Sequence, residues 1–240
     1  YVPTTIPHRK FEVPSLEPYA DKPWPEEAKI FAAMVTRMDG HVGRTMALLK
    51  ELHLDEKTIV FFTSDNGSAM GWEGLFNSCG PLRDKKGSVY EGGIRCPMIV
   101  RWPGRIPAGV VSDAIWYFAD FLPTAAALAG ATAPDRVDGV NVLPAILGKT
   151  PHLSDRSVYW EMHRRGGQFQ QAARRGDWKA VRFGLDSPLE LYNLAEDIGE
   201  KDNVAAQHPD VVARFEAYLK TARIPSPHWP VARERPGDSP

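Results

Sequence analysis

The pattern of hydrophobic and polar residues in the first part of the chain predicts one helix and two buried strands. Across residues 25–52, apolar residues recur every three or four positions, which predicts one long amphipathic helix. Residues 58–63, TIVFFT, are apolar almost throughout, which predicts a strand buried on both faces, as in a parallel sheet. A second buried strand is predicted at residues 97–102. The first 150 residues therefore indicate an α/β arrangement.

The pattern changes in the last third of the chain. Four short strands are predicted at residues 158–161, 170–174, 178–183 and 190–194, and a helix at 209–221. Short strands at such close spacing favour an antiparallel meander with the helix packed on it. A further strand is expected at 112–117, and a short helix from Asp120 to about Gly130. The loop-rich stretch 134–154 is typical of a linker, so the chain is expected to divide into residues 1–150 and 151–240.

Composition narrows the possible partners. The chain has 240 residues, 43% of them hydrophobic, and a net charge of −1, so it has no global positive field to attract nucleic acid or an anionic membrane. No stretch approaches the roughly 20 apolar residues that a membrane span requires. We expect neither nucleic acid nor membrane as a partner. The first residue is Tyr1 rather than Met, which is expected of a processed or truncated chain.

Candidate chemistry gathers between the two buried strands. Asp65 and Asn66, in the sequence SDNG, directly follow the first strand and offer hard oxygen donors that suit calcium or magnesium better than zinc. Asp-Asn-Gly is also a common turn sequence, so a plain turn is the alternative. Residues 82–95, here called the lysine loop, carry Lys85 and Lys86 into the second strand. A cation and an ammonium group facing one pocket would bind an oxyanion.

These blocks resemble a known family. The order SDNG, then GPLRDKKGSVYEGGIRCP, then WPG is similar to the second half of the type I sulfatases, the arylsulfatase-like branch of the alkaline phosphatase superfamily. The resemblance runs from Thr5 to about Leu219. It implies that residues 1–150 form part of an alkaline-phosphatase-like mixed or parallel sheet flanked by helices. Residues 151–240 would then be a small α+β C-terminal subdomain with an antiparallel sheet and one helix.

The resemblance also implies roles for individual residues. Asp65 and Asn66 would hold Ca²⁺, with Mg²⁺ possible, while Lys86 and His8 would bind the sulfate and take part in catalysis. The register of the family motif favours Lys86 over Lys85. Glu91 and Arg95 are interpreted as residues that fix the lysine loop rather than touch substrate.

The family's nucleophile is a formylglycine made from the cysteine or serine of a C-x-P-x-R motif. Residues 79–83, CGPLR, match that motif literally, but they follow SDNG, whereas in relatives the motif precedes it. We therefore interpret the match at Cys79 as a coincidence. The formylglycine and the remaining metal ligands are expected on a missing N-terminal half of the same protein, so this chain alone is expected to be inactive.

The resemblance therefore predicts a sulfuric ester hydrolase, a metal-dependent sulfatase acting on an aryl or carbohydrate sulfate ester. Its partner would be a sulfated small molecule or glycan, in a periplasmic, secreted or lysosome-like compartment. Two alternatives remain open. One is a phosphomonoester or phosphonate hydrolase of the same superfamily, and the other is a non-catalytic sulfate-binding or structural fragment.

Overall fold

The structure is a computed structural model that describes residues 1–70, 72, 74–149, 153–163, 169–228 and 230–231. It divides into two compact units. The first unit comprises Tyr1–Phe62, Trp72–Leu75 and Ile99–Ala108, and the second Thr63–Gly71, Phe76–Met98 and Gly109–Pro240. The domain boundary expected at residue 150 falls on residues 150–152, which lie outside the described residues, so it stays a prediction.

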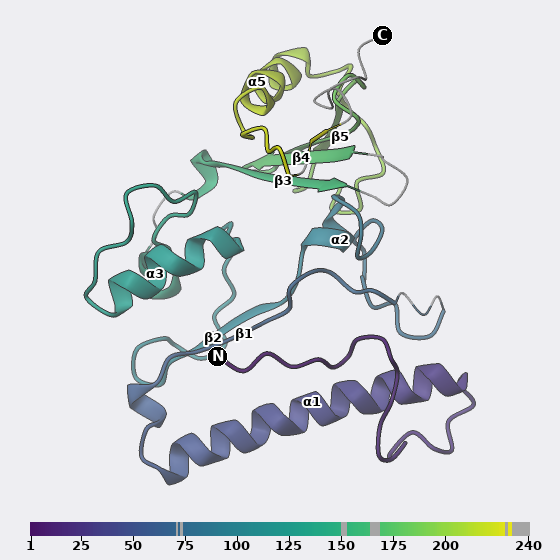
Figure 1. The fold of residues 1–240 in the computed structure, drawn as a ribbon, viewed down its shortest axis with the longest axis vertical. Coiled ribbons are helices and arrows are strands. Elements are labelled where there is room, and N and C mark those ends of the chain that lie inside the picture. Colours follow the sequence, from purple (N-terminus) through teal and green to yellow (C-terminus); the bar gives the residue numbers. More distant parts are fainter. Residues whose placement is uncertain (71, 73, 150–152, 164–168, 229, 232–240) are drawn as a thin grey trace. The chain divides into compact units, whose positions relative to one another are not determined.

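The first unit is built around the long helix α1 (Glu26–Glu51), which agrees with the predicted helix to one residue at each end. Pro25 precedes it, Glu26 lies in its first turn and Lys50 in its last, so these charges complement the helix dipole. The chain before α1 runs alongside it (Figure 1). The short 3₁₀ helix η1 (Asp55–Lys57) then leads into the first strand.

Strands β1 (Val60–Thr63) and β2 (Met98–Arg101) pair in a two-stranded sheet. Just before β2, the Cys96 thiol lies 3.0 Å from the carbonyl oxygen of Ser64, just after β1. At the other end, Arg101 pairs with Asp55, with 2.7 Å between Nη1 and Oδ1. The start of β2 therefore lies beside the end of β1, so the two strands run antiparallel. The apolar run of β1 indicated a strand of a parallel sheet, but its neighbour β2 is antiparallel, because an apolar run reports burial and not strand direction. An antiparallel pair is compatible with the mixed sheet that the resemblance implies.

These two strands are also less buried than their sequences predict. All four residues of β1 are half-buried, and Ile99 in β2 is 59% exposed. In the described part of the chain each strand has one sheet neighbour, so the apolar side chains have little to pack against. The expected burial on both faces is therefore wrong for this structure.

The second unit contains a four-stranded sheet in the order β3-β4-β5-β6, with every pair antiparallel. Its strands confirm the predicted meander, and α5 (Pro209–Leu219) confirms the predicted helix. Gly176, at a φ of 58°, makes the tight turn between β4 and β5. Figure 1 shows α5 lying over the sheet. The four strands are β3 (Ser157–His163), β4 (Phe169–Arg175), β5 (Trp178–Phe183) and β6 (Glu190–Asn193).

Both faces of this sheet are covered, and different parts of the chain cover them. Since neighbouring residues of a strand face opposite ways, Ala173 packs under Phe215 of α5, whereas Ala172 belongs to the core on the other face. That second core contains Val89 and Tyr90 from the lysine loop. The lysine loop is therefore part of the hydrophobic core of the C-terminal sheet.

Short elements complete the second unit. The helix predicted after Asp120 is present as η2 (Phe118–Asp120) and α3 (Phe121–Leu128), and Gly130 follows it at a φ of 67°. The strand expected at 112–117 is wrong, because these residues form no regular structure. The other elements are α2 (Glu91–Ile94), α4 (Leu143–Ile146) and η3 (Leu153–Asp155). Among the described helices, none has the length and apolar character needed to cross a membrane.

Candidate functional site

The turn after β1, residues 64–67, carries the two predicted metal ligands. Asp65 is exposed and Asn66 is half-buried, and the Asn66 amide Nδ2 lies 2.5 Å from Asp65 Oδ1. The next residue, Gly67, donates its backbone N–H to Gly93 at 3.0 Å. A Cβ at Gly67 would lie 1.9 Å from the carbonyl oxygen of Gly92. Only glycine fits there, so this turn sits directly on α2.

The lysine loop wraps around the same helix. Gly92 donates its N–H to the Arg83 carbonyl at 2.8 Å, and a Cβ at Gly93 would lie 2.1 Å from the Ser88 carbonyl oxygen. The Lys86 backbone N–H donates to the carbonyl oxygen of Ser68 at 2.9 Å. The structure therefore brings the backbone of Lys86 next to the turn that carries Asp65 and Asn66.

The antiparallel pairing of β1 and β2 explains why the lysine loop lies next to the turn that carries Asp65 and Asn66. Because β2 begins where β1 ends, the lysine loop entering β2 reaches the turn leaving β1. Within the loop, Lys86 is half-buried whereas Lys85 is exposed, which fits the choice of Lys86. The roles of Asp65, Asn66 and Lys86 in binding stay predictions.

The fourth predicted residue, His8, belongs to the first compact unit. Its side chain is exposed, and its Nδ1 lies 2.9 Å from the backbone carbonyl of Arg9, to which it donates a hydrogen bond. The contact of His8 with sulfate stays a prediction based on the resemblance.

The cysteine motif at residues 79–83 has a structural explanation. Cys79 is half-buried, and burial raises the pKa of its thiol. Arg83 donates from Nη1 to Tyr192 Oη at 2.9 Å and to the Glu200 carbonyl at 2.6 Å. Its guanidinium carbon also lies 3.8 Å from the ring centre of Tyr90. Arg83 thus fastens the lysine loop to β6, which is consistent with a coincidental match to the nucleophile motif.

The Glu91 side chain belongs to a buried group of charges that we call the ion cluster: Glu91, Lys179 and Glu200. Lys179 Nζ lies 2.9 Å from Glu91 Oε1 and 2.8 Å from Glu200 Oε1, and the Lys179 side chain is 0% exposed. Glu200 Oε2 accepts the backbone N–H of Glu91 at 2.7 Å. These buried contacts are consistent with the interpretation that Glu91 fixes the loop, which stays a prediction.

The pKa values of the two carboxyl groups in the ion cluster are shifted in opposite directions. Burial works to raise the pKa of Glu91, but the Lys179 ammonium and Arg174 guanidinium outweigh it and hold that pKa below its ordinary value. At Glu200 burial prevails and raises the pKa. Sequence reasoning missed Lys179 and Glu200. The available signal was a lysine inside the otherwise apolar stretch of β5 before Ala180.

The donor set around Asp65 fits one side of a cation site. A carboxylate and an amide oxygen are the ligands that Ca²⁺ and Mg²⁺ prefer, but calcium takes six to eight oxygens. Within the described residues, no cluster of three or more His, Cys, Asp or Glu side chains could hold a metal ion. Asp65 and Asn66 could therefore supply part of a hard-cation site, and other donors would have to complete it.

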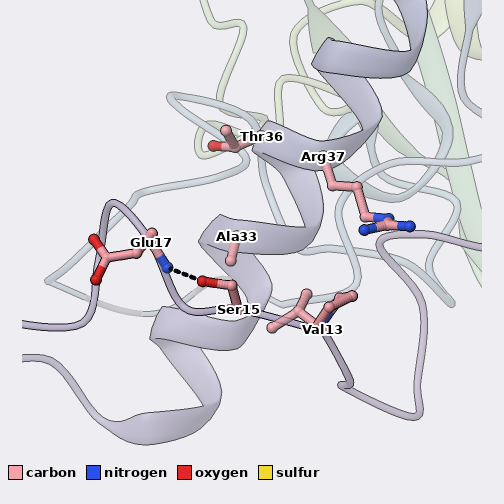
Figure 2. Close-up of a pocket in the computed structure, with 7 residues that line it drawn as sticks. Val13, Ser15, Glu17, Ala33, Thr36 and Arg37 are labelled. Carbon is pink, nitrogen blue, oxygen red and sulfur yellow. Dashed lines mark hydrogen bonds between the residues drawn. The ribbon is translucent and has the colours of Figure 1, made fainter.

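A surface hollow of about 180 Å³ lies in the first unit, between the chain around Ser15 and helix α1. Figure 2 shows Val13, Ser15 and Glu17 on one side of it and Ala33, Thr36 and Arg37 on the other. It is smaller than the roughly 300–1,000 Å³ typical of ligand pockets. None of the predicted site residues lines it, so we assign it no chemistry.

Comparison with known families identifies the class of protein. The Sulfatase family model matches residues 8–131, more than half of the chain, and the model of the N-sulphoglucosamine sulphohydrolase C-terminal region matches residues 82–224. The chain belongs to the sulfatase family. This confirms the resemblance seen in the sequence, and the solved relatives confirm an alkaline-phosphatase-like fold.

Individual relatives agree with this assignment. N-acetylgalactosamine-6-sulfatase of Canis lupus familiaris is 39% identical over 192 residues, which are 78% of this chain and 36% of the relative. The crystal structure of Ps i-CgsB in complex with k-i-k-neocarrahexaose has a TM-score of 0.72 at 32% identity and covers 84% of this chain and 44% of that one. The phosphonate monoester hydrolase of Agrobacterium radiobacter has a TM-score of 0.64 at 25% identity, covering 81% and 40%. The chain spans well under half the length of these relatives.

Proposed function

We propose that this chain forms the metal-binding and sulfate-binding side of a sulfuric ester hydrolase that acts on a sulfated glycan or aryl sulfate. The observation that carries the proposal is the 2.9 Å hydrogen bond between Lys86 N and Ser68 O, which holds the lysine loop against the turn with the oxygen donors. Membership of the sulfatase family and the glycan sulfatase among its relatives support the substrate class. A periplasmic, secreted or lysosome-like location is proposed on the same basis.

Each predicted residue has a defined task in this proposal. Asp65 and Asn66 hold a calcium or magnesium ion, whose positive charge would neutralise the sulfuryl oxygens when bound. Lys86 directs its ammonium group at a sulfate oxygen or at the leaving oxygen. His8 donates a hydrogen bond to the sulfate. Fixed cationic and donor groups of this kind stabilise the charge that develops in the transition state.

The nucleophile is proposed to lie on another, N-terminal segment of the same polypeptide. Three observations support this. Cys79 is half-buried, and Arg83 of its motif is bound to Tyr192 and to the Glu200 carbonyl. Asp65 and Asn66 provide too few oxygens for a complete calcium site. The apolar strand β1 is only half-buried, as expected if further strands normally cover it.

Hydrolysis of 4-nitrophenyl sulfate by the 240-residue chain and by a longer polypeptide that extends it at the N-terminus tests the proposal. We expect turnover by the longer polypeptide and none by the 240 residues. In the longer polypeptide, removing Ca²⁺ with a chelator should abolish turnover and adding it back should restore it.

Lys86→Ala should lower kcat of the longer polypeptide by about a hundredfold or more. Its exposed neighbour provides the matched control, because Lys85→Ala should leave kcat nearly unchanged. Turnover by the short chain alone would contradict the proposal.

A phosphonate or phosphomonoester hydrolase is the second candidate. The likeness to the phosphonate monoester hydrolase favours it, since a cation with a lysine holds a phosphoryl group as readily as a sulfuryl group. Rates with 4-nitrophenyl sulfate, 4-nitrophenyl phosphate and 4-nitrophenyl phenylphosphonate separate the two. A kcat/KM that is highest for the phosphonate would favour the second candidate.

A further inference from the structure

We propose that Lys179, on strand β5 of the C-terminal sheet, is a positioning residue for Lys86. It would act through the ion cluster, which fixes the helix that the lysine loop wraps around. This inference rests on the proposed function of Lys86 and adds a distant residue, on a different sheet, to the machinery.

The ion cluster holds the start of helix α2 in a fixed position. The Lys179 ammonium is completely buried and lies within 2.9 Å of carboxylate oxygens on both Glu91 and Glu200. A buried ion pair is often no more stabilising than an apolar pair of the same volume, but moving one partner away is strongly destabilising because it leaves a buried charge without its counter-charge. The backbone N–H of Glu91 is held as well, by the second oxygen of Glu200. Both the side chain and the backbone at the start of α2 are therefore fixed.

A displacement of α2 would displace the lysine loop as well, because the two backbones are packed without space between them. A Cβ at Gly92 would lie 2.1 Å from the Asp84 carbonyl oxygen, and one at Gly93 would lie 2.1 Å from that of Ser88. These two contacts flank Lys86 in the sequence. A shift of α2 must therefore move the loop on both sides of Lys86.

A second attachment holds the other end of the loop and meets the first at Glu200. The Glu200 side chain binds Lys179, while its backbone carbonyl accepts a hydrogen bond from Arg83 at 2.6 Å. Glu200 has a φ of 50°, an uncommon conformation for a residue with a side chain. Arg83 lies at the start of the lysine loop and Glu91 lies near its end. Both bind Glu200, which follows strand β6.

The test is a double-mutant cycle in the longer polypeptide, with 4-nitrophenyl sulfate as substrate and all variants assayed below their unfolding temperatures. Lys179→Met should lower kcat/KM by about ten- to hundredfold, because a small misplacement of a catalytic group is costly. In the Lys86→Ala background the same substitution should cause a clearly smaller loss of kcat/KM, because the part that acts through Lys86 is gone and only a part acting through the Asp65 turn, which also packs on α2, remains.

Arg182→Met is the matched control. Arg182 lies on the same strand and also forms an ion pair, 3.3 Å from Glu216 of α5, but on the side away from the lysine loop. It should reduce thermal stability and leave kcat/KM within about twofold. If Lys179→Met gives no folded protein, Glu91→Gln takes its place in the cycle with the same criteria.

An equal loss from Lys179→Met in both backgrounds, or no loss with Lys86 present, would overturn the inference alone. Full activity of Lys86→Ala would overturn the proposed role of Lys86 and with it this inference. The two failures are therefore distinguishable.

Discussion

The two sheets of this protein show opposite relations between composition and burial. Strand β1 reads VFFT, yet all of its residues are only half-buried. Strands β4 and β5 contain glutamine, lysine and arginine, yet Gln170 and Lys179 are 0% exposed. Burial therefore follows from what covers a strand and not from how apolar the strand is.

The two sheets differ in burial because different segments of the chain pack against them. Helix α5 covers one face of the four-stranded sheet and the lysine loop covers the other, so even its polar residues are enclosed. Most of these polar residues have partners: Lys179 binds two carboxylates, and Gln171 contacts Tyr159 and Arg182. In the described residues β1 and β2 have only each other as sheet neighbours.

The largest expected effect comes from the core of the four-stranded sheet. Phe215→Ala, under α5, should lower the free energy of unfolding of the 240-residue chain by about 3–5 kcal/mol, because it leaves a cavity between helix and sheet. Ile99→Ala in the exposed face of β2 should cost less than about 1 kcal/mol. Urea unfolding measures both. In the longer polypeptide Ile99→Ala should cost more, if additional strands cover β2, and an unchanged cost would argue against such a cover.

A smaller effect is expected from the glycines that seat the lysine loop. Gly92→Ala should destabilise the protein by about 1–3 kcal/mol, because the new methyl group would overlap backbone atoms of the loop. Gly40 of α1 is the control, since nothing lies within 4 Å of a Cβ there. Gly40→Ala should stabilise the protein by about 0.5–1 kcal/mol through helix propensity. Thermal unfolding of both variants checks this, and similar effects at the two sites would refute the close packing of α2.

The smallest effect concerns pH and the ion cluster. The pKa of Glu91 is held below its ordinary 4.5, so its contribution to stability is complete above about pH 4.5 and is lost as the pH falls through its folded value. Glu91→Gln should therefore weaken the acid destabilisation seen in urea unfolding between about pH 3 and 6.

Glu200 should have the opposite effect on the pH dependence of stability. Its raised pKa favours the folded state at low pH, and this contribution is lost as the pH rises through 4.5 towards the folded value. Glu200→Gln should steepen the acid destabilisation. Equal pH slopes for the two variants would show that the carboxyl groups do not differ as described.

Much of the fold could be predicted from local patterns. The steps of three and four between apolar residues located α1 to within one residue at each end. The motif order identified the family. These features depend on neighbouring residues only, so one sequence contains the information.

Other features required contacts between residues far apart in the chain. The strand expected at 112–117 did not form, because a strand requires a partner that a local pattern cannot supply. The lysine loop reaches the turn that carries Asp65 because β1 and β2 pair antiparallel, and an apolar run does not reveal strand direction.

The sequence by itself determined the family, the amphipathic helix and the C-terminal meander, because these depend on residue type and spacing. Only the tertiary structure decided that Glu91 meets Lys179, 88 positions away, and that Glu200 joins both ends of the lysine loop to the C-terminal sheet. The physical reason is that a buried charge chooses its partner by proximity in the folded chain, where water is excluded and each ion must be neutralised by whatever group lies beside it.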